Sequence, residues 1–221
     1  MLTRVISILV LSTLFAGCLN PRDTGPTKIV NRLIPADLKA YWDFHPGSYW
    51  IYEDSATGKL DTVTVVDRQQ VIFDSELVYD SDTKGICERL SLEMETSAGP
   101  TYYYGINTAH GSDKIPYYMT SNWSRVGGIS AVASGVCFVY PLIVGNTTYD
   151  PFPHRTDTLS INAIHHQAFG FDSVVQINQT YNIVEGEQYT RWFWAKNVGI
   201  IRKVWIDSAR VENLIDYHVL Q

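Results

Sequence analysis

The sequence predicts a mainly β fold: an antiparallel sheet of about ten strands, forming a sandwich or a half-barrel, with at most one or two short helices. Three observations lead to this prediction. Short runs of β-branched and aromatic residues alternate with polar residues over most of the chain. Clusters of Gly, Asn and Asp separate these runs, as turns require. Apolar residues at helical spacing are scarce.

The first seventeen residues have the pattern of a secretory signal peptide. Arg4 precedes an uncharged run of apolar and hydroxyl residues at 5–16. This run is too short for a membrane-spanning helix, which needs about 20 apolar residues. The segment Phe15-Ala16-Gly17-Cys18 follows and resembles the lipobox of bacterial lipoproteins. The resemblance implies that residues 1–17 are removed and that the Cys18 thiol takes a lipid with acyl chains such as palmitate.

Such a lipid would anchor the protein in the cell envelope. Each buried methylene contributes about 0.8 kcal/mol, so two or three acyl chains hold a protein firmly on a bilayer. Leu19 stands where the inner-membrane retention signal of enterobacterial lipoproteins has Asp. The resemblance therefore favours the outer membrane, on its periplasmic face or at the cell surface. The membrane would be a partner through this lipid alone.

The chain after the signal peptide divides into two parts. Residues 18–42 are predicted to form the lipidated N-terminus and a flexible tether, because Pro21, Gly25 and Pro26 lie among polar residues without periodicity. Within this part, residues 34–41 could form one or two helical turns. Residues 43–221 are predicted to form a single β-rich domain, large enough for a core of its own.

Strands are expected throughout this domain. In residues 86–95 the alternation is clearest, with Glu88, Leu90 and Leu92 among the residues of one face. We therefore expect one dry and one wet face there. Other strands are predicted at 49–52, 60–66, 70–73, 101–106, 115–119, 136–144, 158–165, 174–184, 189–195, 199–206 and 214–220.

Two segments carry a second resemblance. Gly47-Ser48-Tyr49-Trp50-Ile51-Tyr52 is an aromatic strand, and Trp194-Ala195-Lys196-Asn197-Val198-Gly199-Ile200 has the pattern of a hairpin. Together they resemble a pattern in uncharacterised bacteroidete-type lipoproteins, where the first segment opens the domain and the second nearly closes it. The resemblance implies a fold and no specific activity.

Asp is followed by Ser or Thr at nine of the fifteen Asp residues. Five of these pairs resemble the O-glycosylation sequon of exported bacteroidete proteins, with the hydroxyl on Ser55, Thr62, Thr158, Ser173 and Ser208. The alternative is that Asp caps the turns between strands by accepting hydrogen bonds from nearby backbone N–H groups. Both interpretations place these residues at the surface.

Cys87 and Cys137 are the two cysteines that follow Cys18. In an oxidising envelope, a lone pair of cysteines favours one disulfide. Such a disulfide would close a loop of about 50 residues, which would contribute up to about 4 kcal/mol of stability. Two buried free thiols are the alternative.

Several classes of partner are not expected. The net charge of −6 and the lone basic pair Arg202-Lys203 argue against nucleic acid, which needs clustered cations. The sequence has no His-Glu-x-x-His or Cys-x-x-Cys motif, so we expect neither a metal nor a cofactor. His165 and His166 would point to opposite faces of a strand, which prevents them from chelating one ion without a bulge.

Enzymatic activity is not expected either. The sequence lacks a Gly-x-Ser-x-Gly nucleophile motif. Because a catalytic triad is defined by geometry and not by order, a secreted hydrolase with a triad built from loops near His154–Asp172 remains the alternative.

Aromatic residues make up 13% of the chain. Strands favour aromatic residues in any case, and a binding role is the alternative explanation. Tyr102–Tyr104 and Tyr117–Tyr118 fall on predicted strands, so alternate rings face outward or line a cavity. We therefore expect a non-catalytic envelope lipoprotein with a binding or structural role. An apolar cavity would favour a lipid-like ligand, whereas a flat row of exposed rings would favour a glycan.

Overall fold

The computed structural model of this chain describes residues 28–77, 80–97, 99, 101–108, 118–124, 135–136, 138–149, 158–183 and 186–221. Within these ranges the chain forms thirteen strands and one helix. In chain order they are β1 (Lys28–Arg32), α2 (Ala36–Trp42), β2 (Tyr49–Asp54), β3 (Leu60–Leu77), β4 (Asp80–Thr96), β5 (Thr101–Asn107), β6 (Tyr118–Ser124), β7 (Gly135–Val136), β8 (Thr147–Tyr149), β9 (Thr158–Ala168), β10 (Phe171–Ile183), β11 (Gly186–Ala195), β12 (Gly199–Trp205) and β13 (Arg210–His218).

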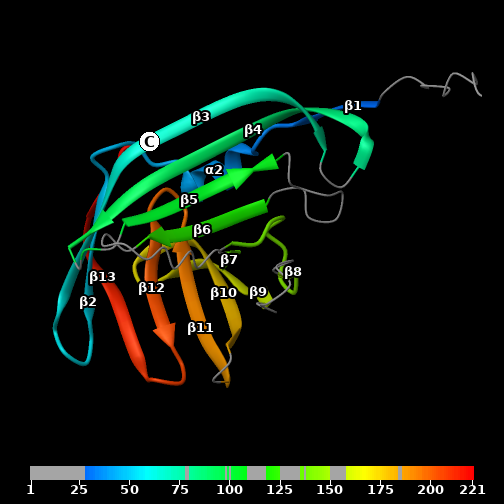
Figure 1. Cartoon of the computed structure of the whole chain (residues 1–221). Coiled ribbons are helices and arrows are strands. Elements are labelled where there is room, and N and C mark those ends of the chain that lie inside the picture. The colour runs from blue at the N-terminus through cyan, green and yellow to red at the C-terminus, as the bar shows by residue number, and fades with distance from the viewer. Residues whose placement is uncertain are drawn as a thin grey trace, which may run out of the picture.

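All thirteen strands belong to one sheet. Twelve of them follow the order β7-β6-β5-β4-β3-β2-β13-β12-β11-β10-β9-β8. β1 lies off this path and pairs in parallel with β4, whereas the pairs along the path are antiparallel. The predicted mainly β, antiparallel fold is therefore confirmed. The sheet is strongly bent, so that β3–β6 arch over β9–β12 (Figure 1).

Helix α2 lies inside this bend. Its residues Leu38, Tyr41 and Trp42 are buried. They belong to one cluster with side chains from both halves of the sheet, which includes Leu90 of β4, Ile106 of β5, Leu159 and Ile161 of β9, and Val175 and Ile177 of β10. The helix thus fills the space that the two halves leave between them.

Ordered structure begins earlier than the sequence predicts. The helical turns predicted at 34–41 are confirmed as α2 at 36–42. Residues 28–32 form β1, and both elements of the predicted 18–42 tether belong to the folded domain. The physical reason is burial, because three apolar side chains of α2 pack in the core. A helix of seven residues has too little periodicity to show this in the sequence. Residues 1–27 lie outside the described ranges.

The predicted strand at 136–144 is wrong beyond its first residue. β7 ends at Val136, and residues 138–146 are irregular, with a bend at 140–141 and a turn at 144–145. Pro141 cannot donate a ladder hydrogen bond, so it does not suit a paired strand. Phe138 and Val139 are nevertheless buried, and the Phe138 ring centroid lies 5.6 Å from that of Tyr41. The apolar character of this run predicts a strand, but Phe138 instead packs against Tyr41 and Trp42 of α2.

β4 shows the predicted dry and wet faces over most of its length. Leu90, Leu92 and Met94 are buried, whereas Arg89 and Glu95 are exposed. The pattern breaks near β1, where the Cys87 side chain is buried against Val30 and Phe73. The parallel pairing of β1 with β4 covers this residue.

Glu88 is the buried charge of β4, with 1% of its surface exposed. Its Oε2 accepts the Ile34 N–H at 2.8 Å, and its Oε1 accepts Lys39 Nζ at 2.7 Å and the Gln70 amide. Burial raises the pKa of Glu88, but the hydrogen bonds from Lys39, Ile34 and Gln70 outweigh it and hold the pKa below its ordinary value. Glu88 therefore ties the start of α2 to β4.

Candidate functional site

A cavity of about 270 Å³ lies on the inner face of the bent sheet. Six strands that are consecutive in the sheet line it: β4, β3, β2, β13, β12 and β11. Five of the six tryptophans of the chain contribute to its wall: Trp42, Trp50, Trp192, Trp194 and Trp205. Apolar atoms make up most of the lining surface. We call this space the tryptophan-lined cavity.

The wall is built from alternate residues of each strand. Residues i and i+2 of a strand share a face, so one short segment sends two side chains inward. These pairs are Trp50 and Tyr52 of β2, Asp61 and Val63 of β3, Leu92 and Met94 of β4, Trp192 and Trp194 of β11, Lys203 and Trp205 of β12, and Arg210 and Glu212 of β13. The curvature of the sheet turns these faces toward one another.

The inner end of the cavity is formed by Trp42, Phe44, Trp50 and Trp194, all of which are buried. Trp42 stacks on Trp194 with ring centroids 5.1 Å apart, and Phe44 meets the Trp50 ring edge-on at 4.9 Å. Such offset and edge-to-face contacts are the favoured arrangements of aromatic pairs. They give the inner end a rigid apolar surface.

The polar edges of three wall residues are engaged with the protein itself. The Trp50 indole N–H donates to the Val198 carbonyl, and the Tyr52 hydroxyl donates to the Ile200 carbonyl at 2.8 Å. The Trp192 indole donates to Thr190 Oγ1 at 3.0 Å. These ring edges therefore have their hydrogen bonds within the protein, and the rings contribute apolar surface to the wall.

The outer end carries four charged side chains, Asp61, Lys203, Arg210 and Glu212, which we call the rim. Glu212 lies between the two cations: its Oε2 is 3.3 Å from Lys203 Nζ, and its Oε1 accepts Arg210 Nη2. Asp61 Oδ1 accepts the Ser97 hydroxyl at 2.8 Å. Burial lowers the pKa of Lys203, and the nearby Glu212 carboxylate offsets this in part.

Both rim cations also cover aromatic rings. Lys203 Nζ lies 4.1 Å from the centroid of the Tyr52 ring, and Arg210 Cζ lies 4.6 Å from that of Trp205. Cation–π contacts of this kind are stronger when they are shielded from water. The Lys203 side chain is only 16% exposed, so its contact with Tyr52 is shielded from water. The Arg210 side chain is half exposed, so its contact with Trp205 is less shielded.

Trp194 carries a polar group without a hydrogen-bond partner in the described part of the chain. Its indole N–H is buried and has no acceptor among the residues that the structure describes. Leaving a buried donor unpaired costs about 1–3 kcal/mol. Because buried polar groups are rarely left unpaired, such groups are of interest at functional sites.

A second hollow lies on the surface near α2 and β9. It is lined by Asp37, Tyr41, Leu142, Ile164, His165, His166, Ser173 and Lys196. No side-chain hydrogen bond joins either imidazole to a serine or aspartate within the described part of the chain, and His154 lies outside it. In the same part, no three His, Cys, Asp or Glu side chains are placed to hold a metal ion. The hydrolase alternative stays a prediction.

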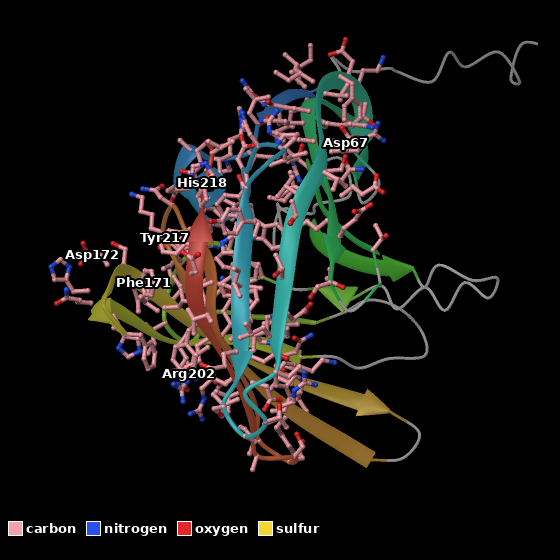
Figure 2. The ribbon with its side chains drawn as sticks, turned by 90° about the vertical axis from the view of Figure 1, so that its left-hand side faces the viewer. Asp67, Phe171, Asp172, Arg202, Tyr217 and His218 are labelled. Carbon is pink, nitrogen blue, oxygen red and sulfur yellow. The ribbon has the colours of Figure 1, made fainter. Side chains whose placement is uncertain are left out.

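The outer face of the sheet carries an exposed aromatic patch. Figure 2 shows Phe171, Tyr217 and Arg202 on one side of the sheet. The rings of Phe171 and Tyr217 lie 5.9 Å apart, and Arg202 Cζ lies 5.1 Å from the centroid of the Phe169 ring. Phe169 is 53% exposed in the turn that joins β9 to β10. Arg202 neighbours Lys203 on the strand and therefore points away from the tryptophan-lined cavity.

The predicted modification sites fall in different settings. Ser55 and Ser208 are exposed in turns, whereas Thr62, Thr158 and Ser173 are half-buried on strands. Asp54 does cap its turn, because its Oδ1 accepts the N–H groups of Ala56 and Thr57 at 3.0 Å. Glycosylation stays a prediction at all five hydroxyls.

The two predicted cysteine sites lie largely outside the described ranges. Cys18 and Cys137 belong to segments that the structure does not describe. Cys87 is buried and forms no disulfide with any residue that the structure describes, and burial raises the pKa of its thiol. The disulfide and the lipidation therefore stay predictions. No helix in the described ranges has the length and apolar character to cross a bilayer.

The residues of the cavity were not among the binding candidates predicted from the sequence. Those aromatic candidates are Tyr102–Tyr104 and Tyr117–Tyr118, and the structure does not describe their side chains. The useful pattern was the aromatic pair at i and i+2, which occurs at Trp50 and Tyr52 and again at Trp192 and Trp194. In a strand this spacing places two rings on one face.

No model of a protein family matches this sequence. No curated protein matches it. A solved structure with some similarity is the crystal structure of a "putative lipoprotein" from Parabacteroides distasonis ATCC 8503. The two chains share 11% sequence identity with a TM-score of 0.32, over 78% of this chain and 95% of the other.

Proposed function

We propose that this chain is a non-catalytic lipoprotein of the cell envelope that holds a small apolar molecule in the tryptophan-lined cavity. The observation that carries the proposal is the cavity itself, about 270 Å³ of space with a mainly apolar wall. Small-molecule sites are concave, mostly apolar, and supplied with a few polar groups that fix orientation. The aromatic inner end and the charged rim match this description.

An apolar ligand fits this wall better than a glycan does. A sugar can stack one C–H face on an aromatic ring, but the hydroxyl groups around its edge need hydrogen-bond partners in the wall. The inner end is formed by ring surfaces, and the ring edges of Trp50 and Tyr52 bond to backbone carbonyls. Five of the six tryptophans line this concave space, whereas a glycan platform would present them in a flat exposed row.

The intrinsic fluorescence of the protein offers a direct test. N-phenyl-1-naphthylamine, an apolar dye, is titrated into the chain from residue 18 onward with Cys18→Ser, which retains every described element. Saturable quenching of tryptophan emission is expected, because most tryptophans line the cavity. Val63→Trp should fill the cavity and reduce the binding by about tenfold.

Val71→Trp is the matched control. Val71 lies on the same strand as Val63 but is 41% exposed and outside the cavity. Binding should be retained in this variant, and circular dichroism should show that both variants are folded. Equal binding by the two variants would place the dye elsewhere and remove the support for the cavity.

Location is tested separately. The proposal of a lipid anchor rests on the apolar run at 5–16 and on Cys18 at its end. Mass spectrometry of the N-terminal peptide should find acyl chains on Cys18, and the Cys18→Ala variant should no longer partition with membranes. A parent protein without fatty acid, or a variant that partitions like the parent, would overturn the anchor and leave the cavity argument intact.

A further inference from the structure

The rim of the tryptophan-lined cavity specifies the polar end of the ligand, and this inference rests on the function proposed above. Two lining side chains are cations, Lys203 and Arg210, and two are anions, Asp61 and Glu212. Their formal charges therefore cancel within the lining, and Arg210 is also ion-paired with Asp54, which lies outside it. A binding site that recognises an ionic head group presents an excess of the opposite charge. This rim presents none.

A cationic head group is disfavoured by the aromatic contacts. Ammonium ligands are recognised by open faces of Trp and Tyr rings. At the outer end of the cavity, the Tyr52 ring is covered by Lys203 and the Trp205 ring by Arg210. A ligand cation would have to displace a cation of the protein itself.

An anionic head group is disfavoured by Glu212. This carboxylate is 9% exposed and already bonds both rim cations. A ligand carboxylate at the same place would compete for Lys203 and Arg210 while lying next to a buried like charge, which is unfavourable. Asp61 adds a second negative charge on the same wall.

An uncharged group that both donates and accepts hydrogen bonds has partners here. The Lys203 ammonium has three N–H donors, and one is directed at Glu212. Each rim carboxylate has about four lone-pair positions, more than its hydrogen bonds use. The inner end, in contrast, is formed by aromatic ring surfaces and carries one polar group, the Trp194 indole N–H, which is unpaired among the described residues.

We propose that the ligand is an uncharged amphiphile, with a hydrocarbon body against the tryptophan rings and a hydroxyl-bearing end at Lys203 and Glu212. Monoacylglycerols have this chemistry. Fatty acids and fatty amines share the hydrocarbon body but carry a charge at the polar end.

Three amphiphiles with the same chain separate these classes: monodecanoylglycerol, decanoate and decylamine. At about pH 7 the second is an anion and the third a cation. Each is titrated below its micelle concentration into the chain from residue 18 onward with Cys18→Ser, and tryptophan quenching is measured. Monodecanoylglycerol should bind about tenfold more tightly than either charged compound, a difference of about 1.4 kcal/mol.

The Glu212→Gln variant tests the charge balance of the rim. It removes the carboxylate that would repel an anionic head group and that occupies both rim cations, so decanoate should gain about fivefold in affinity relative to monodecanoylglycerol. Glu53→Gln is the matched control, because Glu53 lies on β2 outside the cavity. This control should keep the order of the three ligands.

The outcomes distinguish the two levels of the proposal. Decanoate or decylamine binding to the parent as tightly as monodecanoylglycerol would overturn the uncharged ligand and leave the apolar-cavity function standing. If none of the three binds, this inference fails, and the naphthylamine titration decides whether the proposed function fails with it.

Discussion

Glu88 joins β4 to the segment that leads into α2, and at the scale of single residues it is the most consequential buried charge described. Its carboxylate accepts hydrogen bonds from the Ile34 backbone, Lys39 and Gln70. Removing one partner of a buried ion pair is costly, because the other partner loses its compensation. Lys39 is 26% exposed and can turn partly toward water, which moderates the loss.

The first prediction concerns the charge of this residue. Glu88→Gln should lower the free energy of unfolding by about 2 kcal/mol, since hydrogen bonds to charged groups contribute about 1.5–3 kcal/mol. Urea unfolding measures the change. Glu95→Gln, exposed on the same strand, should alter stability by less than about 0.5 kcal/mol. A loss in Glu88→Gln no larger than in this control would show that Glu88 does not hold the helix in place.

The second prediction follows from the lowered pKa of Glu88. The unfolded chain binds this proton near its ordinary pKa of about 4.3, and the folded chain binds it at lower pH. The ionised carboxylate therefore stabilises the fold above about pH 4.3, and this contribution is lost as the pH falls through the folded pKa. The stability difference between the parent and Glu88→Gln should be constant above about pH 5 and shrink in more acidic solution.

Urea unfolding of both proteins over a series of pH values checks this second prediction. The difference should decrease on the acidic side only. A difference that grows toward low pH would mean that burial dominates and that the pKa of Glu88 is raised in the folded state.

At the scale of elements, α2 is the main packing unit inside the bend of the sheet. Leu38 is completely buried in the cluster that unites both halves. Leu38→Ala should therefore lower the free energy of unfolding by about 2–5 kcal/mol, as the loss of buried methyl groups leaves a cavity. Ile29→Ala on β1, where the residue is 73% exposed, should change it by less than about 0.5 kcal/mol. Similar small effects in both would mean that α2 does not belong to the core.

Most strands could be predicted from the sequence because their pattern is local. The alternation in β4 identified its buried face, and Asn197 and Gly199 marked the turn between β11 and β12, where both adopt positive φ. The predicted strands at 60–66 and 70–73 merged into the single strand β3. The intervening polar residues suggested a break, but pairing with β4 continues through them with a bulge between Val65 and Asp67.

The failures at this scale have a common cause. The run at 136–144 and strand β1 at 28–32 are placed by tertiary packing, which local propensity does not encode. Phe138 packs against Trp42 and Trp194, and β1 pairs with β4, which lies far away in the sequence. Both contacts join residues that are far apart in the sequence, so no local sequence pattern predicts them.

At the scale of the whole molecule, the cavity arises from long-range topology. The last strand, β13, pairs with β2 and thereby closes the wall between the early and late strands of the domain. The sequence showed the aromatic pairs at i and i+2 but not which strands would be neighbours. The curvature of the sheet was equally hidden, so the cavity could not be predicted although its residues were visible.

The most direct test of the central claim is a crystal structure of the protein with monodecanoylglycerol that carries bromine at the end of its chain. The anomalous signal of bromine locates the chain end without ambiguity from weak ligand density. The bromine should lie at the inner end of the tryptophan-lined cavity, near Trp42 and Trp194, with the glycerol at Lys203 and Glu212. A bromine peak on the outer face beside Phe171 and Tyr217, with the cavity empty, would contradict the account.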